Sequence, residues 1–422
     1  MAQLSDDCFA FGGPLMTLDE ARGLLAERLV AVTGSERVAL GEALDRVLAE
    51  DVVAGVNVPP HDNSAVDGYA VRHEDLAGGA DSVLPIVARV AAGDRPVSRD
   101  PAGTAVRIFT GAPMPEGYDT VMMQEDCVER DGPGGTRSVL IRPGIKRGAN
   151  RRSAGEDVRE GSVILSAGRR LRPQDIGLMA AVGLTDALVR APLRVAILST
   201  GNELMEPGQP LAPGGIYDAN RFTLSALVRR MGGRVTDFGI LRDNPAELRA
   251  VLARAAEGHD LIVTTGGVST GEEDHVKGAV EALGGLHFWR LAIKPGRPVA
   301  LGQVAGKPFI GLPGNPVAAM ITFFCLARPL IQHLAGETVT EPVLFRVRAD
   351  FDYKKKEGRR EFVRVRLARD GDGGLVATKF ARDGAGVLSS MVESDGLVIL
   401  PEDVTRLERG ATVSYMPFTE VR

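Results

Sequence analysis

The segment LRVAILSTGNE, residues 193–203, decides the fold because a near-continuous apolar run ends abruptly in small polar residues. Such a run is typical of a strand buried on both faces, as in a parallel sheet covered by helices. DLIVTTGG, residues 260–267, repeats the pattern. Between the two lie segments with helical spacing, at 220–233 and 244–258, the second with Asn244 as N-cap and Pro245 after it. This alternation predicts an α/β domain with a parallel-rich sheet and helices on both faces.

The flanking segments have a different texture. TLDEARGLLAERLV, residues 17–30, begins with a capping box of Thr17 and Glu20 and predicts a helix. SERVALGEALDRVLAEDVVA, residues 35–54, predicts a second helix with Ser35 as its cap. Short apolar runs between Gly and Pro turns predict an all-β unit at about 56–143, and similar runs after about 341 predict a small β domain.

We therefore predict four parts, of which only one is α/β. A helical and mixed linking domain is discontinuous, an inserted β domain interrupts it, and a barrel-like β domain ends the chain. The predicted bounds are 15–55 with 144–185, then 56–143, 186–338 and 339–422.

Composition and charge exclude several classes of function. The 422 residues carry a net charge of −5, which favours neither nucleic acid nor an anionic membrane as a partner. The three cysteines form no C-x-x-C pair, so a disulfide framework or a cysteine-based zinc site is not expected. No run reads as a signal peptide or a membrane span. We expect a reduced, cytoplasmic protein.

Polar loops follow the predicted strands at one end of the sheet, where open α/β sheets bind ligands. TTGGVSTGEED, residues 264–274, is the most informative, because glycines let the backbone approach a ligand and its N–H and hydroxyl groups suit phosphate. Its acidic end would repel a phosphate unless a divalent cation, with magnesium favoured, lay between them. A single Gly-Gly turn after a strand usually has only a structural role. Five polar loops at the same end of the sheet, however, predict a small-molecule site. The other four loops are residues 199–203, 242–244, 294–298 and 312–316.

Two basic stretches could bind an anion or simply face solvent. Arg290 and Lys294 are four residues apart, so a single strand would point them to the same side, with Arg297 nearby. Arg360, Arg364 and Arg366 share one side of a predicted strand, which gives a cationic face that could hold an oxyanion reaching in from a partner subunit.

Eight motifs together resemble one family. They are PPHDNSAVDGYA, FTGAPMPEG, SAGEDV, STGNEL, YDANR, TTGGVSTGEED, FWRLAIKPGRP and LPGNPVAA, in the order seen in MoeA proteins and the gephyrin E domain. The resemblance covers about residues 15–417. It implies a homodimer of four-part subunits with one domain like molybdopterin adenylyltransferase, and a molybdopterin molybdenumtransferase activity. The substrates implied are adenylylated molybdopterin and molybdate, AMP is released, and Mg²⁺ is the helper ion.

The same resemblance implies site residues by motif. Those with an implied catalytic role are Asp67, Thr110, Asp157, Glu203, Asp243, Asp274 and Lys294. Substrate contacts are expected from Thr200, Gly266, Gly267, Ser269, Arg290, Arg297, Arg364 and Ser389, and magnesium ligands from among Glu203, Asp218, Asp243 and Asp274. The family often has Lys at Arg290, Ser at Ala318 and, in some relatives, Ser at Ala385, so this chain departs from the pattern around molybdate and leaves Ser389 and Ser390 as candidates.

Other interpretations remain open at this stage. The chain could be a molybdopterin adenylyltransferase, although that enzyme is a single α/β domain, or a gephyrin-like scaffold without catalysis. Molybdopterin adenylyltransferase and molybdoenzyme-maturation proteins are candidate partners. Asp67, in the loop 59–70, lies far in sequence from the α/β loops, and we expect the homodimer to bring it to the partner subunit's cleft.

Overall fold

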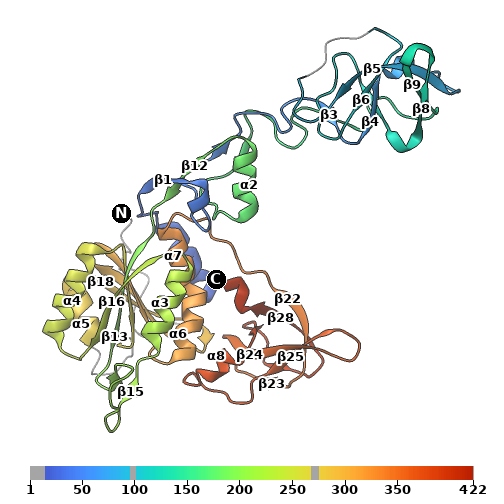
Figure 1. Ribbon diagram of the computed structural model, residues 1–422. Helices are drawn as coiled ribbons and strands as arrows, with labels where there is room; N and C mark the ends of the chain where they lie inside the picture. Colours follow the sequence, from blue (N-terminus) through green and yellow to red (C-terminus); the bar gives the residue numbers. More distant parts are fainter. Residues whose placement is uncertain (1–14, 96–100, 268–274, 422) are drawn as a thin grey trace.

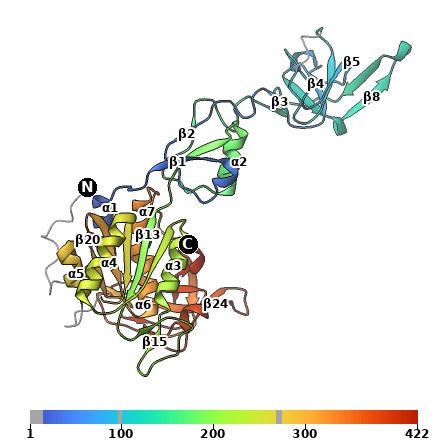
Figure 2. The ribbon, with the colours of Figure 1, turned by 60° about the vertical axis from the view of Figure 1, so that its left-hand side comes forward.

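The computed structural model describes residues 15–95, 101–267 and 275–421. It shows an elongated molecule in which the α/β unit and the C-terminal β unit lie together at one end (Figure 1). A small linking unit follows, and the inserted β unit forms the opposite end, as the turned view also shows (Figure 2). The four-part architecture is as predicted, while the residue bounds that we gave for the parts stay predictions.

The α/β unit is built on one six-stranded sheet. The order across it is β16-β13-β17-β21-β20-β18. The first four strands are mutually parallel. At one edge β20 pairs antiparallel with β21, and β18 pairs antiparallel with β20. The strand bounds are β13 (Arg194–Thr200), β16 (Arg234–Leu241), β17 (Leu261–Thr265), β18 (Gly284–Arg290), β20 (Pro298–Val304) and β21 (Lys307–Leu312).

Helices cover both faces of this sheet, which confirms the predicted three layers. One apolar core lies under α3 (Asn220–Arg230) and the continuous helix made of α6 (Pro316–Thr322), a π turn (Phe323–Ala327) and α7 (Arg328–Leu334). The other lies under α4 (Pro245–Gly258) and α5 (His275–Leu283). The Asn244 side chain caps α4 by accepting from the N–H groups of Ala246 and Glu247.

Two helices, one long and one at the start of the chain, bury apolar side chains in the first of these cores. The helix Pro316–Leu334 is long and apolar enough to cross a membrane, which we did not expect, but 89% of its most apolar window is buried inside the protein. It is therefore a core helix. The predicted first helix, α1 (Leu18–Arg28), has its capping box and buries Leu18, Ala21 and Leu25 in the α/β core, although we assigned it to the linking domain.

The predicted second helix, 35–54, is wrong. Its residues form β1 (Ser35–Ala39), a 3₁₀ turn (Leu40–Glu42) and β2 (Val52–Val53). The reason is tertiary, because β1 pairs with β12 (Asp186–Arg190) and β2 with β11 (Val163–Leu165), more than a hundred residues away. Beside them α2 (Pro173–Ala181) closes a small core around Leu48, Leu171 and Met179.

The inserted unit is all β, as predicted. Its sheet has the order β7-β4-β6-β5-β9-β8, and a short pair, β3 (Asn63–Ser64) with β10 (Arg151–Arg152), lies where the chain enters and leaves. The strand bounds are β4 (Gly68–Val71), β5 (Ser82–Val90), β6 (Ala105–Ile108), β7 (Thr120–Met123), β8 (Cys127–Asp131) and β9 (Arg137–Ile141).

The C-terminal unit is a closed five-stranded barrel, which confirms the barrel-like prediction. Closure comes from β24 (Arg360–Arg369), which pairs with both β25 (Leu375–Lys379) and β26 (Gly396–Leu400). The other barrel strands are β22 (Phe345–Ala349) and β28 (Thr412–Pro417). The α/β unit adds β19 (Ile293–Lys294) as an extra strand beside β24, so the two units share a sheet edge.

Candidate functional site

A polar cavity of about 460 Å³ lies at the carboxyl ends of the parallel strands, where the sequence predicted a site. Four residues that we singled out line it: Thr200 at the end of β13, Glu203 after it, Asp218 and Gly266. The remaining wall comes from β14 (Leu204–Met205), β15 (Ile216–Tyr217), the end of β17, the start of α3, the turn between β21 and α6, and one residue of the C-terminal unit. Ser199, Thr265, Gly314, Asn315 and Pro316, which also line the cavity, belong to loops that we predicted at this edge. Tyr217, Asn220 and Gly386 lie outside those loops.

The backbone geometry of the turn at residues 266 and 267 requires glycine at both positions. Both residues have positive φ, +84° and +63°, which side chains rarely adopt. A Cβ on Gly266 would lie 2.4 Å from the Thr200 carbonyl oxygen, and one on Gly267 would lie 2.6 Å from Thr200 Oγ1. The Thr200 side chain is buried, and Oγ1 has no hydrogen-bond partner among the described residues. A buried hydroxyl next to backbone without side chains, as at Thr200 and the two glycines, suits the binding of an oxyanion.

Asn220 fixes the shape of this cavity, although we did not list it as a site residue. Its Nδ2 donates to Thr265 Oγ1 (2.8 Å) and to the carbonyl of Gly314 (2.7 Å). Thr265 Oγ1 in turn donates to the Pro313 carbonyl (3.1 Å). The end of β17 and the turn after β21 are thereby tied to α3. The YDANR motif marked this stretch, but only the fold reveals which atoms Asn220 joins.

The predicted acidic residues differ in burial and in their bonding partners. Asp218 is buried and accepts from Arg221 Nε at 3.0 Å, and Arg221 also pairs with Asp237 and Glu206. This network engages the Asp218 carboxylate within the protein. The Glu203 carboxylate, in contrast, is exposed at the cavity and has no hydrogen-bond or ion-pair partner among the described residues. Asp243 is outside the lining, with its N–H bonded to Asn202 Oδ1 at 3.3 Å. Asp274 and Ser269 lie outside the described residues.

The described residues contain no group of three or more His, Cys, Asp or Glu side chains that could hold a metal ion alone. Magnesium at phosphate sites needs only one or two carboxylates, because phosphate oxygens and water complete its octahedral shell. Glu203 fits that requirement.

The predicted cations are not on one strand. β18 ends at Arg290, the chain turns, and Lys294 belongs to β19 beside the barrel, so the alternation that we expected to align the two side chains does not apply. Arg290 and Arg297 are exposed. Lys294 Nζ lies 3.1 Å from Glu361 Oε2 of β24, across the boundary between the α/β and C-terminal units.

The arginines of β24 do not form the open cationic face that we predicted. Arg360 forms ion pairs with Asp19 and Glu402, and Arg366 lies 3.8 Å from Glu393. Arg364 is buried, and its guanidinium donates to Ser390 Oγ (3.1 Å) and to the carbonyls of Arg382 and Gly384. Burial lowers the pKa of Arg364 from its ordinary value.

These bonds of Arg364 hold the loop that lies against α6. The carbonyl of Ala385 in this loop accepts from Val317 N (2.9 Å), and Gly386 lines the cavity. Ser389 is exposed at the start of α8 (Ser389–Val392), beside the buried Ser390. The C-terminal unit therefore supplies part of the cavity wall.

Asp67 and Thr110 form a second cluster in the inserted unit. Asp67 Oδ1 accepts from Thr110 N (2.8 Å) and Thr110 Oγ1 (3.0 Å), and the first of these bonds does most to hold the pKa of Asp67 below its usual value. Asp157 is exposed, with its N–H bonded to the Val58 carbonyl at 3.0 Å, just before the loop 59–70. The inserted unit with this cluster lies far from the α/β unit with the cavity within one chain (Figures 1 and 2).

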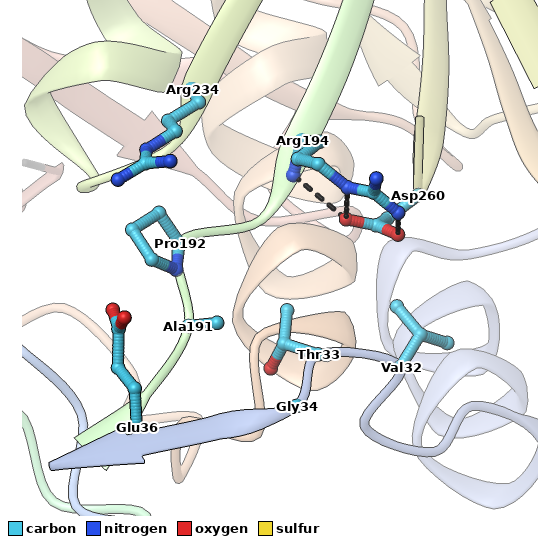
Figure 3. Close-up of a pocket in the computed structure, with 9 residues that line it drawn as sticks. All are labelled: Val32, Thr33, Gly34, Glu36, Ala191, Pro192, Arg194, Arg234 and Asp260. Atoms are coloured by element: carbon cyan, nitrogen blue, oxygen red, sulfur yellow. Dashed lines mark hydrogen bonds and ion pairs between the residues drawn. The ribbon is translucent and has the colours of Figure 1, made fainter. Parts of the chain in front are cut away.

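A further cavity of about 250 Å³ opens at the opposite, amino end of the sheet (Figure 3). It lies between the linking unit and the starts of β13 and β16, and Arg194 forms a two-bond ion pair with Asp260 at its edge (2.8 and 3.1 Å). Among the predicted site residues that the structure describes, none lines it. The two cavities are thus at opposite ends of the same strands, and the chemistry that we predicted belongs to the carboxyl end.

The fold and the first cavity define a four-part protein with a small-molecule site at the carboxyl edge of an α/β sheet. Models of known protein families match almost the whole chain. The MoeA N-terminal region (domain I and II) matches residues 16–183, a probable molybdopterin binding domain matches 196–333, and the MoeA C-terminal region (domain IV) matches 346–418. The chain belongs to the MoeA family, which confirms the resemblance carried by the eight motifs.

Individual relatives are similar over nearly their full lengths. A Haemophilus influenzae protein named molybdopterin molybdenumtransferase is 39% identical over 408 residues, covering 96% of this chain and all of the relative. Molybdopterin molybdenumtransferase 2 of Mycobacterium tuberculosis is 37% identical over 393 residues, 90% and 95% of the two chains. The crystal structure of the molybdopterin biosynthesis MoeA protein from Pyrococcus horikoshii OT3 superposes with a TM-score of 0.80 at 30% identity, covering 96% of this chain and all of that one.

Proposed function

We propose that this chain is a molybdopterin molybdenumtransferase that completes the molybdenum cofactor by inserting molybdate into adenylylated molybdopterin with release of AMP. The observation that carries the proposal is the cavity at the carboxyl ends of β13 and β17. It combines a buried hydroxyl that has no partner within the described residues, a Gly-Gly turn without side chains and an exposed carboxylate, which together suit a pyrophosphate with a cation. Full-length relatives that bear this enzyme's name support the assignment.

In this proposal the pyrophosphate of the substrate lies against Gly266, Gly267 and Thr200. The Gly266 N–H is bonded to the Leu312 carbonyl (3.1 Å), so the glycines contribute close backbone approach, not that donor. The Thr200 hydroxyl orients the pyrophosphate, and the bonds of Asn220 keep the turn rigid. Glu203 would hold Mg²⁺, which when bound neutralises the pyrophosphate and makes AMP a better leaving group. Ser269, Asp243 and Asp274 stay candidate contacts on the same side of the sheet. Asp218 would act through Arg221 by fixing the loop before α3.

Molybdate is a dianion, and we assign its capture to the cations at the boundary with the C-terminal unit. Lys294 is the central candidate because its side chain is 50% exposed and its ammonium is already oriented by Glu361. Arg290, Arg297, Arg364 and Ser389 are further candidate contacts. Only Arg364 among them is buried, so its part would be to shape the loop that carries Gly386 as well as to attract the anion.

We further propose a homodimer in which the inserted unit of one subunit reaches the cavity of the other. Asp67 and Thr110 are implied as functional by their motifs. They lie next to β4 and β6 of the inserted unit, which is at the opposite end of the molecule from the α/β unit that carries Glu203. A two-fold dimer places a distant patch of one subunit against the partner without any change of fold. We place the protein in the cytoplasm, with molybdopterin adenylyltransferase and molybdoenzyme-maturation proteins as its protein partners.

The direct test is to incubate the purified protein with adenylylated molybdopterin, molybdate and Mg²⁺, and to measure AMP together with finished cofactor. We expect both to form in equal amounts, and omission of Mg²⁺ to prevent it. Protein that makes adenylylated molybdopterin from ATP would be an adenylyltransferase. Protein that binds the substrate without turnover would be a scaffold. Either result would contradict the proposal.

A further inference from the structure

A buried carboxylate lies where the α/β unit and the C-terminal barrel share a sheet edge. β19 runs parallel to β24, with Lys294 in register with Glu361, and Arg360 N donates to the Ala292 carbonyl (2.8 Å). The Glu361 side chain is 1% exposed, whereas that of Lys294 is 50% exposed. The pair therefore joins a carboxylate fixed inside the protein to an ammonium that reaches solvent.

Three donors surround the Glu361 carboxylate. Lys294 Nζ lies 3.1 Å from Oε2, Tyr353 Oη donates to the same oxygen at 2.9 Å, and an Arg359 guanidinium nitrogen is 3.5 Å from Oε1. A buried charge is tolerated only when such partners compensate for its lost hydration. Because Tyr353 and Arg359 already satisfy the carboxylate from the barrel side, Glu361 has a fixed position before Lys294 reaches it.

Tyr353 adds to this rigidity. Its burial, and then its bond to Glu361, raise the pKa of the hydroxyl, which therefore stays a donor at all working pH values. The ammonium groups of Lys294 and Lys379 lie 5.9 and 5.7 Å from the centre of its ring. Lys379 is bound by Asp383 (2.8 Å), three residues before Gly386 in the cavity wall. The contacts thus run from Lys294 to the loop at the cavity.

We propose that Glu361 is a positioning residue for molybdate capture: it holds one N–H of the Lys294 ammonium and leaves the other donors directed at solvent for the oxyanion. This inference rests on the proposed function. A lysine side chain is flexible, so an ammonium held in advance loses less freedom when the anion binds. The preference of Lys294 for one geometry then comes from the C-terminal barrel, not from its own strand.

The experiment compares Glu361→Gln with a matched control, Glu402→Gln, by AMP release at varied molybdate. Gln has the size of Glu but no charge, and Glu402 belongs to the same interface, where it pairs with Arg360 and does not touch Lys294. We expect Glu361→Gln to raise the KM for molybdate about tenfold, the effect of losing one charge-assisted hydrogen bond. The KM for adenylylated molybdopterin should stay within about twofold, and Glu402→Gln should change neither KM.

A purely structural role would lower the yield of folded enzyme, or both KM values together, without this split. An unchanged KM for molybdate in folded Glu361→Gln would overturn the proposal. If that variant does not fold, Tyr353→Phe replaces it: loss of the bond that fixes Glu361 should raise the KM for molybdate about threefold, and no change would overturn the proposal.

Failure of the proposed function has a separate signature, namely no AMP release by the wild-type protein. Molybdate binding is then measured by equilibrium dialysis with the wild-type protein, Glu361→Gln and Glu402→Gln. Weaker binding by Glu361→Gln alone supports the positioning role. Equal dissociation constants for all three, or no binding by the wild-type protein, overturn it.

Discussion

The cavity of the α/β unit and the Asp67–Thr110 cluster of the inserted unit are organised in opposite ways. The cavity is assembled from segments spread over residues 199–386 that the fold brings together, and hydrogen bonds from Asn220 tie its edges. The Asp67 cluster is local, exposed and at the far end of the chain. One region is a polar cavity, whereas the other is a carboxylate exposed on the surface of the inserted unit. In the homodimer that we propose, the two regions are half-sites that meet across the subunit boundary.

The largest effect should come from the cavity. We expect Glu203→Gln to lower the rate of AMP release by about 100-fold or more, because the contribution of a metal to charge stabilisation is worth several kcal/mol. The measurement is single-turnover AMP release at saturating Mg²⁺. Glu206→Gln is the matched control, since Glu206 is nearby and pairs with Arg221 outside the cavity lining. Equal rates for wild type and Glu203→Gln would remove Glu203 from the site.

The second effect concerns the other region. Asp67→Asn should reduce the rate about 10- to 100-fold without a change in thermal stability, because an exposed carboxylate adds little to the fold. Since its hydrogen bonds with Thr110 lower the pKa of Asp67, the group stays ionised as the pH falls to its ordinary value of 3.8. The loss should therefore be the same from pH 6 to pH 8. Thr110→Val, which keeps the backbone N–H but not the hydroxyl, should lose less activity than Asp67→Asn, and the reverse order would contradict the role of the carboxylate.

A smaller effect is expected where the cavity is held in shape. Asn220→Ala removes two hydrogen bonds and should lower the free energy of unfolding by about 1–3 kcal/mol. The KM for adenylylated molybdopterin should rise about fivefold, because the turn after β21 is less restrained. Thr223→Ala on the same helix, where the hydroxyl bonds to the Ala219 carbonyl, is the control. An unchanged KM in Asn220→Ala would show that the cavity keeps its shape without this residue.

The smallest effect on catalysis should come from the linking unit between the two regions. Burial raises the pKa of Asp175, but hydrogen bonds from Arg169 and Arg172 outweigh it and hold the pKa below its ordinary 3.8. A lowered pKa in the folded state stabilises it above pH 3.8, and this stabilisation is lost as the pH falls further. Asp175→Asn should therefore cost about 1–2 kcal/mol at pH 7, because both arginines are partly in solvent, with the difference shrinking below about pH 4. Denaturant unfolding at several pH values measures it, and kcat at pH 7 should be unchanged.

Much of the fold could be predicted from local pattern. The strand 194–200 is recognised by its apolar run, and the helix 245–258 by its apolar spacing and its cap. Both are predictable because the burial of these elements depends on their own residues. Residues 35–54 misled us, since their helical spacing is overridden by pairing with strands at 163–190 that no local pattern reveals. The closure of the C-terminal barrel likewise depends on a pairing between β24 and β26 that sequence spacing does not show.

The sequence predicted which residues form the site better than it predicted the contacts that those residues make. Thr200, Glu203 and Gly266 follow from the rule that ligands bind at the carboxyl ends of strands. The buried setting of Arg364 and the pairing of Asp218 with Arg221 could not be read from charge alone, because charge pattern does not say which side chains face inward. Gly386 was missed since it comes from another unit.

The central claim, that a complete site combines the cavity of one subunit with Asp67 of the other, is tested most directly by mixed dimers of Asp67→Asn and Glu203→Gln chains. Each variant alone should retain at most about a tenth of the wild-type activity. In a purified mixed dimer, one site would have an intact cavity and an intact partner Asp67, so activity should return to about half that of the wild-type dimer, as two-fold symmetry requires. If both residues served a site within one chain, the mixed dimer would stay as inactive as its parents, and that result would contradict the account.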